Sequence, residues 1–175
     1  DLVGAEDALC RPHFLSGSHA LSVALFGCLR AGDTLLAVTG RPYDTLEGVI
    51  GINGAGAGCG SLAEYGVKYD EVPLVNGREP DWEQIAQKAP GATVCHIQRS
   101  RGYANRPAFD LETIGRIVKT VKAANPDAVV LVDNCYGTFT QTEEPTAVGA
   151  DLIVGSLIKN AGGGIAPTGG YIAGR

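Results

Sequence analysis

The sequence predicts an α/β domain, a three-layer α/β/α sandwich around a mostly parallel sheet of seven strands. Short apolar runs alternate with amphipathic stretches along the chain, which is the pattern of repeated strand–helix units. The run Ala128–Val132 (AVVLV) is nearly continuous, as expected for a central parallel strand buried on both faces. The last two runs are too close together for a helical crossover, so we expect one antiparallel strand at the end of the chain.

The seven expected strands are short runs of apolar and β-branched residues that end at turn residues. In chain order they are Pro12–Leu15, Thr34–Val38, Val67–Leu74, Thr93–Gln98, Ala128–Val132, Asp151–Val154 and Gly170–Ala173.

Four stretches between these runs have the spacing of amphipathic helices. Asp81 and Asp110 each stand where a helix N-cap is expected, and Gly32 and Asn125-Pro126 are stop signals. The expected helices follow Ser16-Gly17-Ser18 as far as Gly32, cover Tyr43–Ile50 and Asp81–Lys88, and begin after Asp110.

The segment Gly51–Gly60 (GINGAGAGCG) is rich in glycine and has neither a helical nor a strand period. It fits no GxGxxG register, and it follows a helix-like stretch, whereas a dinucleotide-binding loop needs a strand before it and a helix after it. We predict a mobile loop near the active site.

The composition is that of one globular domain. Of the 175 residues, 45% are hydrophobic and 19% are charged, which excludes a disordered chain. The net charge is -5 and Lys and Arg form no run, so neither nucleic acid nor a membrane surface has electrostatic support as a partner. The first residue is Asp and the chain contains no Met, so we expect it to be part of a longer polypeptide.

Neither cysteine nor histidine spacing predicts a metal site. The cysteines are odd in number and lack a CxxC pair, and three of them lie inside apolar segments. We therefore expect small, reduced core residues of a cytoplasmic protein. The residues concerned are Cys10, Cys28, Cys59, Cys95 and Cys135, with the scattered histidines His13, His19 and His96.

Polar residues follow several of the expected strands, at the edge where open α/β sheets bind ligands. Ser16-Gly17-Ser18 forms a small-residue turn at a helix N-terminus, which is either an anion site or an ordinary N-cap. Asp133 ends an apolar strand, where a carboxylate pairs with a ligand cation or with a nearby Arg, or caps a loop. Lys159 follows another strand, three residues after Ser156, and is either a surface residue or a reactive amine.

Taken together, these features point to pyridoxal phosphate. The turn would hold the phosphate, and Tyr43 would cover the ring face. Asp133 would keep the ring nitrogen protonated, and Lys159 would carry the aldehyde.

The chain resembles the large domain of fold type I pyridoxal-phosphate enzymes of the Cys/Met-metabolism group, in particular the methionine gamma-lyase-like aluminium resistance family. The matching segments are FLSGSHALSVALFG (14–27), GRPYDTLEGVIG (40–51), IQRSRGYANRP (97–107), VDNCYG (132–137) and GADLIVGSLIKNAGGGIAPTGGYIAG (149–174).

The resemblance covers essentially the whole chain, 1–175, and implies a role for several positions. Lys159 matches the Schiff-base lysine and Asp133 the partner of the ring nitrogen. Ser156, with the backbone amides of Gly17 and Ser18, would contact the phosphate. Tyr43 matches the tyrosine that stacks on the ring and is a second catalytic candidate.

The chain departs from the wider group at two places, and a third residue has no assigned role. Asn105-Arg106-Pro107 replaces an Asn-Pro pair, which puts the role of Asn105 beside the ring hydroxyl in doubt. The cluster Arg99-Ser100-Arg101 could bind a substrate carboxylate or pair with a neighbouring subunit. His19 could touch the cofactor or face solvent.

The resemblance implies a carbon–sulfur lyase that acts on a sulfur amino acid by β- or γ-elimination, as a cytoplasmic homodimer or homotetramer. An aminotransferase or decarboxylase on the same scaffold is the first alternative, and a non-catalytic cofactor-binding or structural domain is the second. Enzymes of this group are about twice as long, so we expect a piece that lacks the N-terminal segment and the C-terminal small domain.

Overall fold

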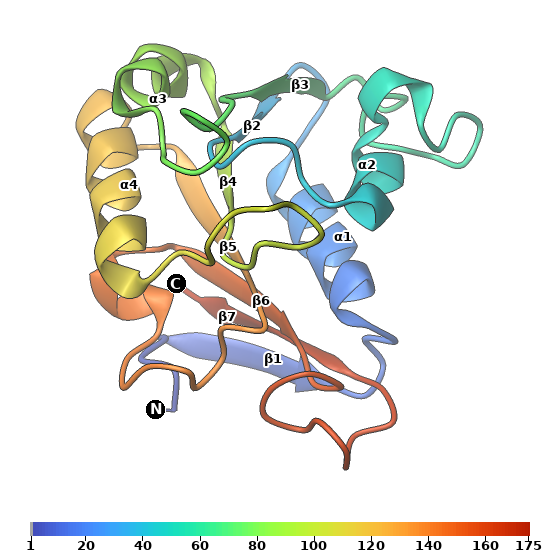
Figure 1. Cartoon of the computed structure of the whole chain (residues 1–175). Helices are drawn as coiled ribbons and strands as arrows, with labels where there is room; N and C mark the ends of the chain where they lie inside the picture. The colour runs from blue at the N-terminus through green and yellow to red at the C-terminus, as the bar shows by residue number, and fades with distance from the viewer. Residues whose placement is uncertain (1) are drawn as a thin grey trace.

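A computed structural model describes residues 2–175, and it contains the predicted seven-stranded sheet between two layers of helices (Figure 1). The strand order is β1-β7-β6-β5-β4-β2-β3. β7 is antiparallel to both of its neighbours and the remaining pairs are parallel, which confirms the single antiparallel strand. The strands are β1 (Asp7–Arg11), β2 (Thr34–Ala37), β3 (Lys68–Glu71), β4 (Val94–Gln98), β5 (Val129–Cys135), β6 (Leu152–Ser156) and β7 (Gly170–Gly174).

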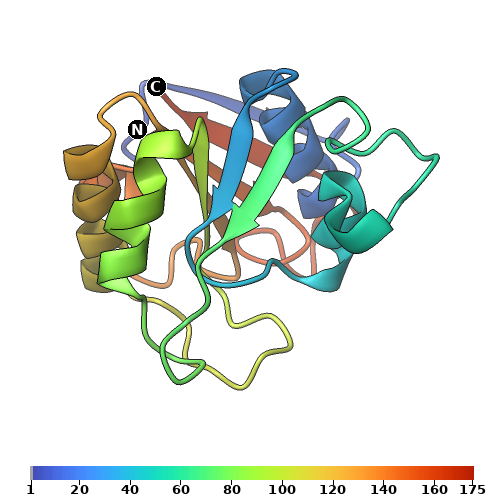
Figure 2. The same ribbon diagram turned by 90° about the horizontal axis from the view of Figure 1, so that it is seen from above.

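The helices cover the sheet from both sides (Figure 2). On one face, α1 and α2 bury leucines and isoleucines against Leu35, Leu131 and Val154 of the sheet. On the other face, α3 and α4 pack against the intervening strand residues, among them Val130 and Val132. The α-helices are α1 (Gly17–Cys28), α2 (Asp44–Ile50), α3 (Trp82–Lys88) and α4 (Leu111–Ala124), and the 3₁₀ turns are Ile52–Gly54, Ala89–Gly91 and Pro145–Val148.

The helix starts agree with the predicted N-caps. The side chain of Asp81 accepts a hydrogen bond from the N–H of Gln84, and that of Asp110 accepts one from the N–H of Thr113. At α1 the Ser16 hydroxyl accepts from the N–H of His19. Each cap satisfies one of the N–H groups that a helix start leaves without a partner.

The first strand was predicted at the wrong place. Pro12–Leu15 is a turn region, and the strand is β1, Asp7–Arg11, which pairs with β7 at the edge of the sheet. All five residues of β1 are exposed, so its sequence DALCR carries no apolar pattern. The apolar Phe14 packs against the core beside α1, which explains why its segment resembled a strand.

The five cysteines are free, but Cys95 alone among them is buried; Cys10 and Cys59 are exposed. The prediction that they are core residues is therefore wrong for most of them. No helix within residues 2–175 is long and apolar enough to cross a membrane.

Candidate active site

A cavity of about 320 Å³ lies where the carboxyl ends of β5 and β6 meet the N-termini of α1 and α2. This is the edge at which open α/β sheets bind ligands, and the volume is at the lower end of that of small-molecule sites. All six predicted site residues line it, namely Gly17, Ser18, Tyr43, Asp133, Ser156 and Lys159, together with Ser100, Tyr103, Cys135 and Tyr136, among others.

The N-terminus of α1 forms one wall of the cavity. The Ser16 hydroxyl accepts from the N–H of His19, and the carbonyl of Ser16 accepts from the N–H of Ala20. The N–H groups of Gly17 and Ser18 have no acceptor within residues 2–175 and are open to a ligand. A Cβ at Gly17 would lie 2.8 Å from the Cβ of Ser156, so glycine allows the helix to approach β6 this closely. The Ser156 hydroxyl is buried and has no partner within the described chain. The helix start and this hydroxyl are suited to bind an anion.

Asp133 lies on the same face of β5 as Leu131, beneath the cavity. It is 2% exposed, and its Oδ2 has no hydrogen-bond partner among residues 2–175. Burial raises the pKa of this carboxyl to about 7, although the charge of Lys159 opposes the rise. A buried carboxylate with an open oxygen is suited to a ligand that donates a proton, and best to a cationic one.

Lys159 follows β6 and is half-buried. Its Nζ lies 2.7 Å from the Sγ of Cys135 and 4.2 Å from the ring centroid of Tyr136. Burial tends to lower the pKa of Lys159, but the hydrogen bond to Cys135 and the negative groups around it raise the pKa above its ordinary value. The amine is thus held inside the cavity as a cation, beside Asp133 but not hydrogen-bonded to it.

Tyr43 is the residue before α2, and its hydroxyl lies 3.0 Å from the Oγ of Ser18. The buried side chain of Gln98 holds it in place, because its Oε1 accepts the Tyr43 N–H at 2.9 Å and its Nε2 donates to the carbonyl of Ser100. Burial raises the pKa of Tyr43 to about 12, so at neutral pH the group is a phenol that can donate a proton.

Sequence reasoning did not single out Cys135 and Gln98. Cys135 stands two positions after Asp133, a spacing that places two residues on one face of a regular strand, so the pattern could have suggested it, although the register of β5 shifts between the two residues. Gln98 could not have been found in this way, because its role depends on contacts with Tyr43, 55 positions away.

Other sequence candidates lie outside the cavity. Asn105 is exposed and does not line it. His19 is exposed, and its Nδ1 accepts the N–H of Leu15. Arg106 is buried and donates to the carbonyls of Gln98 and Ser100, which fixes the loop after β4.

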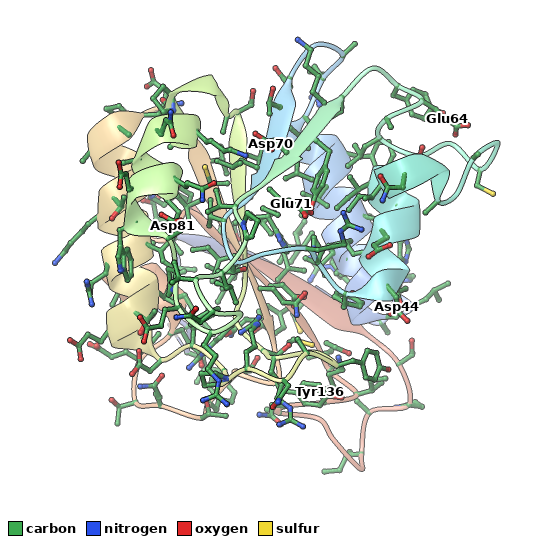
Figure 3. All side chains as sticks on the ribbon, turned by 45° about the horizontal axis from the view of Figure 1, so that its top comes forward. Asp44, Glu64, Asp70, Glu71, Asp81 and Tyr136 are labelled. Carbon is green, nitrogen blue, oxygen red and sulfur yellow. The ribbon has the colours of Figure 1, made fainter. Side chains whose placement is uncertain are left out.

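The Gly-rich segment 51–60 also lies away from the cavity, contrary to the prediction, and contributes none of the lining. The carboxylate of Glu64 accepts hydrogen bonds from the N–H groups of Gly58, Gly60 and Ser61 and so stabilises the conformation of the segment. Figure 3 shows Glu64 far from Tyr136, which lines the cavity.

Arg99, proposed above to bind a substrate carboxylate or a neighbouring subunit, binds side chains of its own domain. Its guanidinium donates to Asn134 Oδ1 at 2.7 Å and lies 3.5 Å from Glu144. Asn134 donates in turn to Glu144 and to the hydroxyl of Tyr171. These side chains are buried on the α4 side of the sheet, so Arg99 is not free for a substrate. Arg101 is exposed.

The sequence profile of the methionine gamma-lyase family matches residues 1–175. YnbB of Bacillus subtilis is 49% identical over 176 residues, which cover 100% of this chain and 42% of YnbB. The structure of a carbon-sulfur lyase involved in aluminium resistance from Clostridium novyi is similar with a TM-score of 0.90 and 53% identity, over 97% of this chain and 40% of that one.

A methionine gamma lyase from Micromonospora echinospora has the same fold, with a TM-score of 0.71 at 20% identity, over 99% of this chain and 40% of that one. The chain thus spans about two fifths of the length of the relatives it matches.

Proposed function

Since the chain belongs to the methionine gamma-lyase family, we propose that the complete protein is a pyridoxal-phosphate-dependent lyase that cleaves a carbon–sulfur bond of a sulfur amino acid by β- or γ-elimination. The observation that carries the proposal is the open Oδ2 of Asp133, buried in the same cavity as Lys159 and the start of α1.

The residues present fit pyridoxal phosphate at both ends of the molecule. The two buried side-chain oxygens that border the cavity without a partner are Asp133 Oδ2 and Ser156 Oγ, among residues 2–175. A protonated ring nitrogen would give the first its donor, and a phosphate would give the second its acceptor, together with the N–H groups of Gly17 and Ser18. An amine, Lys159, stands within the same cavity to bind an aldehyde.

When bound, the cofactor supplies a ring that withdraws electrons from the substrate Cα. Asp133 holds a proton on the ring nitrogen, because its buried carboxylate stabilises that charge. Lys159 Nζ would hold the aldehyde of the cofactor and, as a free amine, would accept the proton from the substrate Cα. Tyr43 would cover the ring, and as a neutral phenol its hydroxyl could donate a proton to the departing sulfur.

The test compares the complete protein with its Lys159→Ala variant. We expect a visible absorption band after addition of pyridoxal phosphate, and after borohydride reduction a mass adduct on the peptide that contains Lys159. The variant should lose both signals, whereas Lys119→Ala, which changes an exposed lysine of α4, should keep them. An adduct on another lysine, with none on Lys159, would contradict the assignment.

Product analysis separates the activities that share this scaffold. Elimination releases ammonia and a keto acid without an amino acceptor, a transaminase needs an acceptor, and a decarboxylase releases carbon dioxide. Failure of the complete protein to bind the cofactor would favour the structural α/β domain. The expected homodimer or homotetramer and the cytoplasmic location stay predictions.

A further inference from the structure

Cys135 forms the wall of the cavity beside Lys159, at the last position of β5. The register of β5 on β6 shifts between Asp133 and Cys135, so that Cys135 pairs with Gly155. Cys135 has a positive φ of 30°, which non-glycine residues rarely adopt. The bulge places its Sγ 2.7 Å from Lys159 Nζ, and the thiol forms no disulfide.

The groups that face this pair come from three segments. Asp133 on β5 and the ring of Tyr136 in the following loop both favour the charged amine, and Ser100 after β4 acts to lower the pKa of the thiol. Burial and the charge of Asp133 raise the pKa of the Cys135 thiol, while Lys159 opposes the rise. Lysine and cysteine therefore stabilise each other's charged forms.

The contact has a consequence for Asp133. Lys159 is close enough to interact with the carboxylate electrostatically, yet its hydrogen bond goes to the sulfur, and Asp133 Oδ2 stays without a partner among residues 2–175. Without the sulfur, the flexible lysine would lose this partner, and the charge of the buried carboxylate would attract the amine. Pairing of the two would occupy the oxygen that the ring nitrogen requires.

We propose that Cys135 is a positioning residue that holds the Lys159 amine inside the cavity and off Asp133 until a carbonyl ligand arrives. The inference rests on the proposed function, since the carbonyl ligand is pyridoxal phosphate. The sulfur itself forms no bond to the ligand.

The first test follows the rate at which pyridoxal phosphate attaches to Lys159 in the complete protein, monitored by absorption over a range of pH. Cys135→Ala should slow attachment about tenfold, the size of one lost hydrogen bond to a charged group, and should shift its pH profile. Cys135→Ser keeps an acceptor and should restore most of the rate. Cys59→Ala, at an exposed thiol in the Gly-rich segment, is the matched control and should change nothing.

The second test needs no cofactor. Iodoacetamide alkylates thiolates, so peptide mass mapping gives the reactivity of Cys135 relative to the exposed Cys59 in the same molecule. Because Lys159 favours the thiolate, Lys159→Met should slow alkylation of Cys135 severalfold and move its pH profile to higher pH.

The two failures can be told apart. If the wild-type protein binds no pyridoxal phosphate, the proposed function fails, while the alkylation still supports or overturns the lysine–cysteine pair. Unchanged alkylation in Lys159→Met, or attachment in Cys135→Ala at the wild-type rate, would overturn the inference.

Discussion

Asp133 and Asn134 are neighbours on β5, but they face opposite sides of the sheet and have opposite polar surroundings. On the α4 side, Asn134 bonds to Arg99, Glu144 and Tyr171. On the α1 side, Asp133 keeps an oxygen with no partner in the described chain. Both side chains are buried, so burial alone does not distinguish them.

This contrast indicates how a ligand site can be recognised in a protein interior. Buried polar groups are normally hydrogen-bonded, so an open one calls for a ligand or has a cost in stability. The polar groups of the cluster on the α4 side hydrogen-bond to one another, and the cluster holds the loop after β5. The open oxygens of Asp133 and Ser156 meet it only when a ligand occupies the cavity.

His96 shows that an open polar atom needs a cavity to have this meaning. Both of its ring nitrogens lack partners in the described part of the chain, yet it lies in the middle of β4 and borders no cavity described above. Burial lowers its pKa to about 4, so it is a neutral core residue. Its effect is on the pH dependence of stability.

The largest expected effect comes from breaking the satisfied cluster. Arg99→Met leaves the Glu144 carboxylate buried without its cation, and the side chain of Glu144 is 3% exposed. Loss of one partner of a buried ion pair costs about 3–5 kcal/mol. The loss should appear as a lower midpoint in urea unfolding of the cofactor-free protein.

Arg101→Met, at an exposed position two residues away, is the control for that change. Its stability should stay within about 0.5 kcal/mol of the wild type. Equal losses in the two variants would show that the Arg99 cluster is not a structural unit.

A smaller effect, of opposite sign, is expected on the α1 side. The folded pKa of Asp133, about 7, lies above its ordinary value of 3.8, so the native state binds more protons between these values. The free energy of unfolding of the cofactor-free protein therefore falls as pH rises through this window, by about 2–4 kcal/mol. In Asp133→Asn this fall should be absent.

His96 contributes in the other direction. Its folded pKa, about 4, lies below 6.5, so stability is lost as pH falls through this range. The two contributions oppose each other in the wild type. In Asp133→Asn, urea unfolding should therefore show stability that rises with pH between 4 and 6.5 more steeply than in the wild type. A pH profile identical to the wild type would contradict the raised pKa of Asp133.

Local patterns in the sequence predicted the α1 side of this comparison but not the α4 side. Asp133 is visible because a carboxylate follows an apolar run, and Lys159 and Ser156 because they follow another. The side chains that bind Arg99 lie 35 or more positions away from it, and no local period reveals such partners. The edge strand β1 was not predicted for a related reason, because it pairs with the distant β7 and all its side chains are exposed.

The smallest effect compares two buried hydroxyls. The Ser156 hydroxyl has no partner within residues 2–175, whereas that of Thr138 lies 2.7 Å from the hydroxyl of Tyr171. Ser156→Ala should leave stability within about 0.5 kcal/mol and weaken pyridoxal phosphate binding by about 1 kcal/mol, measured by titration. Thr138→Val should do the reverse, with a loss of about 1 kcal/mol in urea unfolding and no change in binding. If Ser156→Ala were as destabilising as Thr138→Val, its hydroxyl would have a structural partner and the contrast between the two faces would fail.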